Sequence, residues 1–166
     1  MLSDRGVAPE LSPEELEAAW FRDCDWLHLT GYSLLRSPMA EAAEAAAELS
    51  GGRLSVDLSS WTAIRDYGPE RLRARLAALA PDVVFANAEE WEALGGFEAP
   101  VRVVKRGSRG FTVLDPDGER EVGPAQGTVV DSTGAGDALA AGFLVGGPDL
   151  AREAAARCVA RLGAMP

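Results

Sequence analysis

The stretch Val129-Val130-Asp131-Ser132-Thr133-Gly134-Ala135-Gly136-Asp137 decides how the rest of this sequence is interpreted. We call its last seven residues, 131–137, the glycine loop. A run of small residues from Ala138 to Phe143 follows and predicts a helix. Two glycines just ahead of a helix let the backbone turn its N–H groups toward one point, where the helix dipole adds positive potential. The glycine loop therefore predicts an anion-binding site at a helix N-terminus.

Asp137 at the end of the glycine loop has two interpretations. Its carboxylate could accept the proton of a hydroxyl that attacks a phosphoryl group held by the loop amides. Alternatively, it only complements the positive end of the helix. Other phosphate-binding loops fit poorly, because a Walker loop needs Gly-Lys-Ser/Thr, and a dinucleotide fingerprint that begins at Gly134 needs glycine or alanine where Leu139 stands.

Strand and helix patterns alternate along the rest of the chain. A short helix is expected from Pro13 to about Arg22, with Ser12 as its N-cap. Further on, the patterns predict strands at 26–30, 54–58, 83–85 and 101–105, a hairpin over 110–122, and helices at 37–49, 70–79, 88–94, 136–144 and 150–162. This alternation predicts an α/β layered fold with a largely parallel sheet, and no break in composition divides the 166 residues into two domains.

Composition and charge exclude several classes of function. The sequence has 16 Lys+Arg against 26 Asp+Glu, a net charge of −10, and this acidic field would repel nucleic acid. No apolar stretch reaches the roughly 20 residues that cross a bilayer, and the first residues lack the apolar core of a secretory signal. Cys24 and Cys158 lie far from each other and from any metal-binding spacing, which argues against a disulfide framework and a zinc site. These features predict a cytoplasmic protein.

The glycine loop and the helix after it resemble the C-terminal signature of the ribokinase-like (PfkB-type) carbohydrate kinases. That signature reads Asp-Thr/Ser-Thr-Gly-Ala-Gly-Asp, followed by a small-residue helix. The resemblance implies that Asp137 is the catalytic base acting on the sugar hydroxyl. It also implies that the backbone amides of Gly134, Ala135 and Gly136 form the anion hole.

The resemblance also implies a cation site. In relatives that use a monovalent cation, the positions matching Asp131 and Thr133 help to hold it, so potassium is an expected cofactor. The segment Arg161-Leu162-Gly163-Ala164 resembles the Arg-x-Gly-Ala segment of the family's tail.

The segment from Pro81 to Glu90 resembles the family's strand and Asn-x-x-Glu motif. In the family this motif lies near the phosphates and organises magnesium through water, which implies such a role for Asn87 and Glu90. Taken by themselves, the two residues also form a capping-box pattern at a helix N-terminus. The two roles can coexist, and the sequence leaves both open.

The segment from Val103 to Gly110 is similar to the family's strand and Gly-Ser-x-Gly turn, which line the nucleotide. The resemblance implies nucleotide contacts from Gly107, Ser108 and Gly110, and a phosphate contact from Lys105. Considered alone, a Gly-Ser-Arg-Gly turn is also typical of an ordinary hairpin entry.

Together these motifs imply a three-layer α/β/α ribokinase-like fold, with residues 1–166 as a single domain. They match the C-terminal, nucleotide-binding part of a family member, so we expect the first strands and the lid to be missing. The implied activity is transfer of the γ-phosphoryl group of ATP, with Mg²⁺, to a hydroxyl of a sugar or nucleoside that the sequence does not specify. After its middle strand the family often has the pattern Asp-x-Asn-x-Arg. In the segment from Asp57 to Trp61, only the aspartate of this pattern is present.

Two other functions remain open. One is a catalytically silent nucleotide-binding or interaction module, and the other is an unrelated α/β binding domain whose glycine loop only caps a helix. An incomplete sheet leaves an unpaired edge and uncovered apolar surface. We therefore expect the chain to associate with a copy of itself or with a complementing N-terminal half.

Overall fold

The computed structural model describes residues 10–124 and 126–164. The chain divides into two compact units, with the boundary between Pro100 and Val101. We call them the N-terminal unit and the C-terminal unit. The expectation of a single domain stays a prediction. Among the described residues, no helix is long and apolar enough to cross a membrane.

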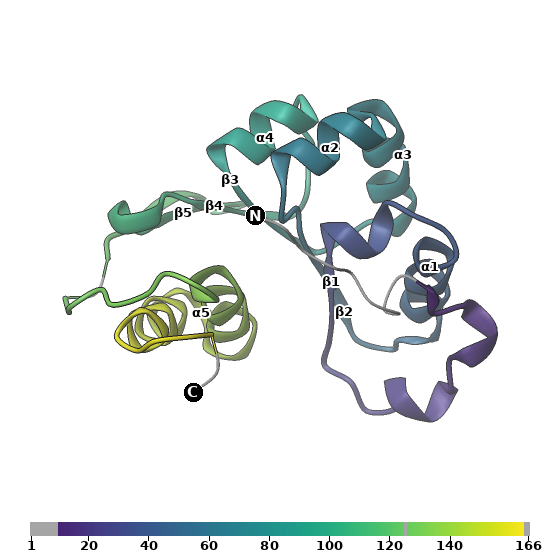
Figure 1. Cartoon of the computed structure of the whole chain (residues 1–166), viewed down its shortest axis with the longest axis horizontal. Coiled ribbons are helices and arrows are strands. Elements are labelled where there is room, and N and C mark those ends of the chain that lie inside the picture. Colours follow the sequence, from purple (N-terminus) through teal and green to yellow (C-terminus); the bar gives the residue numbers. More distant parts are fainter. Residues whose placement is uncertain (1–9, 125, 165–166) are drawn as a thin grey trace. The chain divides into compact units, whose positions relative to one another are not determined.

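Parallel strands form the centre of the N-terminal unit. These strands are β1 (Trp26–Thr30), β2 (Arg53–Asp57) and β3 (Val83–Asn87), and each pairs in parallel with the next. The connecting helices are η4 (Gly31–Leu34), α1 (Met39–Leu49), α2 (Trp61–Tyr67), α3 (Pro69–Leu79) and α4 (Ala88–Leu94), as Figure 1 shows. The predicted alternation of strands and helices is confirmed here.

One apolar core joins these strands to helices α1 to α4. The strands contribute Leu29, Val56 and Val84, which are register partners across the sheet. The helices contribute Ala43, Ile64, Leu72, Leu76 and Leu94. Because side chains alternate between the faces of a strand, the opposite face carries a different set. There the Nδ1 atom of His28 lies 2.8 Å from Ser55 Oγ, which makes His28 a packed residue of the sheet, as its place on an alternating strand indicates.

One helical prediction in the N-terminal unit is wrong, and one helix was not predicted. The helix expected from Pro13 to about Arg22 is replaced by two single-turn 3₁₀ helices, η2 (Pro13–Glu15) and η3 (Ala18–Phe21). Neither buries a residue, so no apolar face stabilises a longer helix. Conversely, helix α2 was not predicted. It buries only Ile64, which gives little periodicity, and its clearest signal is Ser60, whose Oγ accepts a hydrogen bond from Ala63 N at 3.3 Å.

The C-terminal unit begins with an antiparallel meander. Strands β4 (Val101–Lys105), β5 (Phe111–Asp115) and β6 (Gly118–Val122) pair in this order, and the 3₁₀ helix η5 (Gly107–Arg109) joins the first two. Asp115 pairs with Gly118, and Asp117 N donates a hydrogen bond of 2.9 Å to Asp115 Oδ1. The predicted hairpin over 110–122 is confirmed.

Helix α5 (Ala135–Val159) completes the C-terminal unit and is broken in the middle. Gly146 and Gly147 leave helical geometry, with φ of −146° and +74°, and Pro148 restarts the helix. The two arms then lie against each other (Figure 1). A Cβ atom on Gly142 would lie 2.7 Å from the Leu150 carbonyl oxygen, so this close contact requires glycine. The two predicted helices are confirmed, although the second ends at Val159 rather than Leu162.

Candidate functional site

The glycine loop forms the N-terminus of helix α5. Gly134 is the N-cap with φ +78°, and its carbonyl accepts the first helical hydrogen bond from Ala138 N at 2.9 Å. Gly136 and Asp137 belong to the first turn, where N–H groups have no acceptor within the helix. Ala135 N donates to the Ser132 carbonyl at 3.2 Å. The amides of Gly134 and Gly136 thus remain for an anion, whereas that of Ala135 would have to share its hydrogen.

Lys105 lies beside this helix N-terminus. It is the last residue of β4, and its Nζ atom lies 3.7 Å from the point where a Cβ atom on Gly136 would be. The ammonium group and the first-turn amides therefore place positive charge around the same small space. The structure brings together two residues that the sequence analysis assigned to separate motifs.

Asp137 is the third residue of α5, and its side chain is exposed. Within residues 10–124 and 126–164, no group donates a hydrogen bond to its carboxylate. The side chain therefore caps no amide, and its carboxylate oxygens can accept a proton or a hydrogen bond from a ligand. Its charge still complements the helix dipole, so both interpretations of Asp137 remain compatible with the geometry.

Asp131 holds the beginning of the glycine loop. Its Oδ1 atom accepts hydrogen bonds from Thr133 N at 2.9 Å and from Thr133 Oγ1 at 2.7 Å, and its Oδ2 atom accepts one from Gly163 N at 3.0 Å. These hydrogen bonds lower the pKa of Asp131 below its ordinary value. The bond from the Thr133 hydroxyl has the largest effect, and the bonds from the two amides add to it. An ionised carboxylate has about four lone-pair sites, so these bonds leave room for a cation. The described residues contain no group of three or more His, Cys, Asp or Glu that could hold a metal ion.

The turn after β4 has the predicted form. Arg106 N donates to the Gly110 carbonyl at 2.8 Å, and Gly110 N donates to the Gly107 carbonyl at 3.0 Å. Gly107 and Gly110 have φ of +58° and +83°, and a Cβ atom on Gly110 would collide with the Val122 carbonyl. Ser108 lies exposed between them. A nucleotide contact by this turn stays a prediction.

Asn87 and Glu90 form a capping box at the N-terminus of α4. Asn87 Oδ1 accepts from Glu90 N at 2.9 Å, while Glu90 Oε2 accepts from Asn87 N at 2.8 Å. Asn87 Nδ2 also donates to Glu90 Oε1 at 3.0 Å, and Glu90 is only 4% exposed. The capping interpretation is confirmed. The cap engages both oxygens of the Glu90 carboxylate, and the role at magnesium stays a prediction.

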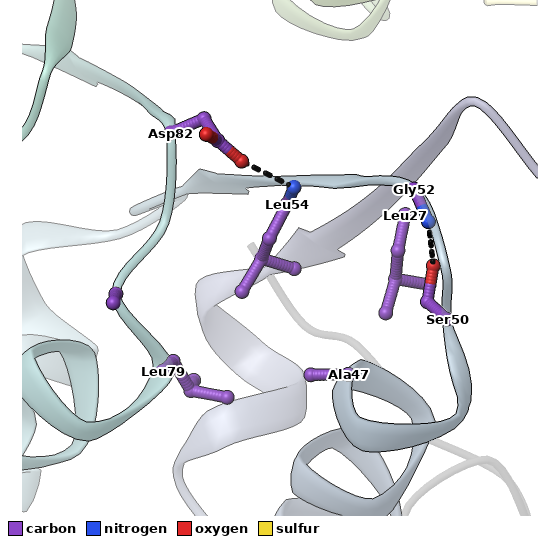
Figure 2. A pocket seen from close by; sticks show the side chains of 8 residues that line it. Leu27, Ala47, Ser50, Gly52, Leu54, Leu79 and Asp82 are labelled. Atoms are coloured by element: carbon purple, nitrogen blue, oxygen red, sulfur yellow. Dashed lines mark hydrogen bonds between the residues drawn. The ribbon is translucent and has the colours of Figure 1, made fainter.

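A cavity of about 210 Å³ lies in the N-terminal unit, close to the first residues of β1 and β2 (Figure 2). Its lining consists of Leu27, Ala47, Ser50, Gly52, Leu54, Leu79, Ala80 and Asp82. The side chains of Ser50 and Asp82 already accept hydrogen bonds from the amides of Gly52 and Leu54. Ligands of parallel sheets bind at the carboxyl ends of the strands, and this cavity lies at the amino ends. We assign it no function.

Comparison with known proteins identifies the family. Residues 1–165 match the pfkB family of carbohydrate kinases. An ATP-dependent ribose-1-phosphate kinase from Halopiger xanaduensis is 34% identical over 153 residues, which cover 87% of this chain and 48% of the relative.

Solved structures give the same result. An adenosine kinase from Sinorhizobium meliloti matches with a TM-score of 0.82 and 27% identity, over 95% of this chain and 55% of that one. An aminoimidazole riboside kinase from Salmonella enterica, solved with aminoimidazole riboside and an ATP analogue, matches with a TM-score of 0.76 and 26% identity, over 93% and 62% of the two chains. This chain thus spans about half the length of such relatives. From these matches and its ribokinase-like α/β fold, we conclude that the chain belongs to the pfkB family of carbohydrate kinases.

Proposed function

We propose that this chain supplies the ATP-binding and phosphoryl-transfer part of a kinase that phosphorylates a hydroxyl group of a sugar or nucleoside. The observation that supports this most strongly is the position of the Lys105 ammonium group beside Gly136, at the positive end of helix α5. A phosphoryl group that is being transferred carries negative charge on its oxygens, and catalysis depends on positioned donors and cations around it. The glycine loop and Lys105 together meet this requirement.

In the proposed mechanism, the amides of Gly134 and Gly136 bind the oxygens of the transferred group, and Lys105 balances their charge. Ala135 contributes its amide by sharing the hydrogen that it donates to Ser132. Asp137 accepts the proton of the substrate hydroxyl while the new O–P bond forms. The bond from the γ-phosphorus to the bridging oxygen breaks, and ADP leaves.

Two cations belong to the proposal. Bound Mg²⁺ would offset the charge of the ATP phosphates, and Asn87 and Glu90 would bind its water ligands. The capping box fits this role, because its hydrogen bonds hold the Glu90 carboxylate in one orientation. Bound K⁺ would be held by Asp131 and Thr133, whose oxygens already lie together.

We further propose that the turn at Gly107, Ser108 and Gly110 lines the nucleotide. The acceptor is assigned only as a sugar or nucleoside, since the names of similar proteins include a ribose-1-phosphate kinase, an adenosine kinase and an aminoimidazole riboside kinase. Both units would form one domain, acting in the cytoplasm. A complementing N-terminal half, or a second copy of the chain, would complete the acceptor site.

A second candidate function stands beside the kinase for this chain, which spans 48% of the ribose-1-phosphate kinase. In this alternative the chain is a nucleotide-binding or interaction module without kinase activity. Both candidates use the glycine loop, and they differ in whether Asp137 has a chemical role.

The test is calorimetric titration of the purified chain with MgATP and MgADP, with and without K⁺, and with the variants Asp137→Asn and Gly136→Ala. We expect saturable binding that survives in Asp137→Asn and weakens by about tenfold in Gly136→Ala, where a methyl group enters the anion site. A folded wild-type chain that binds neither nucleotide would overturn the proposal. Phosphoryl transfer by the wild-type chain to any acceptor would exclude the silent module, and its loss in Asp137→Asn would assign the role of base to Asp137.

A further inference from the structure

The end of helix α5 and the segment after it contact the glycine loop. We call these residues, 158–164, the C-terminal turn. The Val159 carbonyl accepts hydrogen bonds from Val130 N at 2.7 Å and from Asp131 N at 3.2 Å. The Gly163 amide donates to Asp131 Oδ2 at 3.0 Å. These bonds attach the beginning of the loop to the C-terminal turn.

Cys158 extends this attachment to Thr133, next to the proposed anion site. Its Sγ atom lies 3.4 Å from the carbonyl oxygen of Thr133, and its thiol donates a hydrogen bond there. A trans peptide is planar, and its C=O and N–H groups point in opposite directions. The carbonyl of Thr133 and the N–H of Gly134 share one peptide plane. A donor that holds the Thr133 carbonyl therefore also sets the direction of the Gly134 N–H.

Ala164 supports the same peptide from another position. A Cβ atom on Gly134 would lie 2.7 Å from Ala164 Cβ and 3.1 Å from Ala164 Cα. The methyl group of Ala164 thus lies directly against the Gly134 backbone and limits its rotation. Gly134 has φ +78°, a conformation that glycine leaves easily unless its surroundings hold it.

We propose that Cys158 is a positioning residue for phosphoryl transfer, because its thiol directs the Gly134 N–H of the glycine loop toward the phosphate. The methyl group of Ala164 limits rotation of the Gly134 backbone away from this orientation. This inference rests on the proposed nucleotide site. It assigns a role to a cysteine that the sequence analysis treated only as a residue outside any disulfide or metal pattern. Cys158 itself touches no reacting atom.

The test compares Cys158→Ala, which removes the donor, with Cys158→Ser, which keeps a donor in the same direction. Cys24→Ala is the matched control, because the Cys24 thiol donates to the Trp26 carbonyl in the N-terminal unit. MgADP affinity is measured by calorimetry, and the Gly134 amide is followed by ¹⁵N NMR and hydrogen exchange without nucleotide. We expect Cys158→Ala to weaken MgADP binding by about 3- to 10-fold and to speed exchange of the Gly134 amide. Cys158→Ser should restore both, and Cys24→Ala should change neither.

The outcomes separate this inference from the proposed function. If wild type binds MgADP and Cys158→Ala leaves both the affinity and the Gly134 amide unchanged, the positioning role is wrong. Equal losses in Cys158→Ala and Cys158→Ser would also overturn it, since they would show that side-chain volume rather than the donor matters. If wild type does not bind MgADP, the proposed function fails and the positioning role fails with it, and the nucleotide-free Gly134 amide then reports only whether Cys158 holds the Thr133–Gly134 peptide.

Discussion

The Nζ atom of Lys105 lies 3.7 Å from the place that a Cβ atom would occupy on Gly136, so an ammonium group from strand β4 borders the first turn of helix α5. Lys105 is also the only lysine in the sequence. An amine-directed reagent can therefore modify only this side chain and the N-terminal amine.

This uniqueness allows a direct test of the phosphate contact. We expect MgADP to slow acylation of Lys105 by about tenfold, because a bound phosphate would cover the ammonium group. Mass spectrometry of the labelled chain measures the rate, and the N-terminal amine is the internal control. Equal rates with and without MgADP, under conditions where the nucleotide is bound, would remove Lys105 from the site.

The two glycines of the loop are expected to respond differently to an added methyl group. In Gly134→Ala the new Cβ atom would lie 2.7 Å from Ala164 Cβ, in a residue with φ +78°, so unfolding free energy should fall by about 1–2 kcal/mol. In Gly136→Ala the nearest atom outside the helix is 3.7 Å away, and alanine favours the helix. Thermal and urea unfolding should show a stable Gly136→Ala chain whose affinity for MgADP is nevertheless reduced. An unstable Gly136→Ala chain would show that this glycine serves packing.

The capping box at Asn87 can be separated from a role at magnesium. Asn87→Ala removes the acceptor of the Glu90 amide and one partner of a buried carboxylate, so we expect it to lower the unfolding free energy by about 1–3 kcal/mol. Asn87→Ser keeps an N-cap acceptor, so its unfolding free energy should fall much less than that of Asn87→Ala. Urea unfolding measures both. If the wild type binds ADP more tightly with Mg²⁺ and Asn87→Ser reduces this preference, the residue also acts at the metal. An unchanged preference would leave it a cap only.

An acid-sensitive ion pair connects the turn after β4 to strand β6. Arg106 Nη1 donates to Glu121 Oε1 at 2.7 Å, and this hydrogen bond, together with the charge of Arg106, lowers the pKa of Glu121 below 4.5. A carboxylate with a lowered pKa in the folded state stabilises the fold above its unfolded pKa, and this stabilisation is lost as the pH falls through the folded value. The melting temperature of Glu121→Gln should therefore lie slightly below that of wild type at pH 7, and the difference should shrink progressively as the pH falls below 4.5.

The effect is small because Glu121 is exposed, so Glu119→Gln on the same strand is the reference variant. If the difference in melting temperature between Glu121→Gln and wild type grows as the pH falls, the Arg106–Glu121 ion pair is not its cause.

Local signals explain which parts of the structure were predicted from the sequence. The hairpin at Asp115 to Gly118 and the helix break near Gly147 depend on turn residues within a few positions of one another. The capping box of Asn87 and Glu90 is equally local, although its pattern alone could not exclude a metal role. Helix α2 escaped prediction because a seven-residue helix with one buried side chain has almost no periodicity.

The contacts that shape the candidate site are long-range, and no pattern in the sequence encodes them. Lys105 meets Gly136, and Cys158 meets Thr133, only after strands and helices have packed. The resemblance of each motif to the family indicated which residues were candidates for the site. It did not indicate that the Ala135 amide would be engaged by Ser132, or that the C-terminal turn would hold the loop.

The most direct test of the proposed site is an amide-detected ¹⁵N NMR titration of the chain with MgADP, with inorganic phosphate as a second ligand. We predict that the largest shifts occur at the amides of Gly134 and Gly136, smaller ones along residues 107–110, and that phosphate alone reproduces the first set. Saturable binding of MgADP with no change at Gly134 and Gly136 would contradict the anion site at the N-terminus of α5.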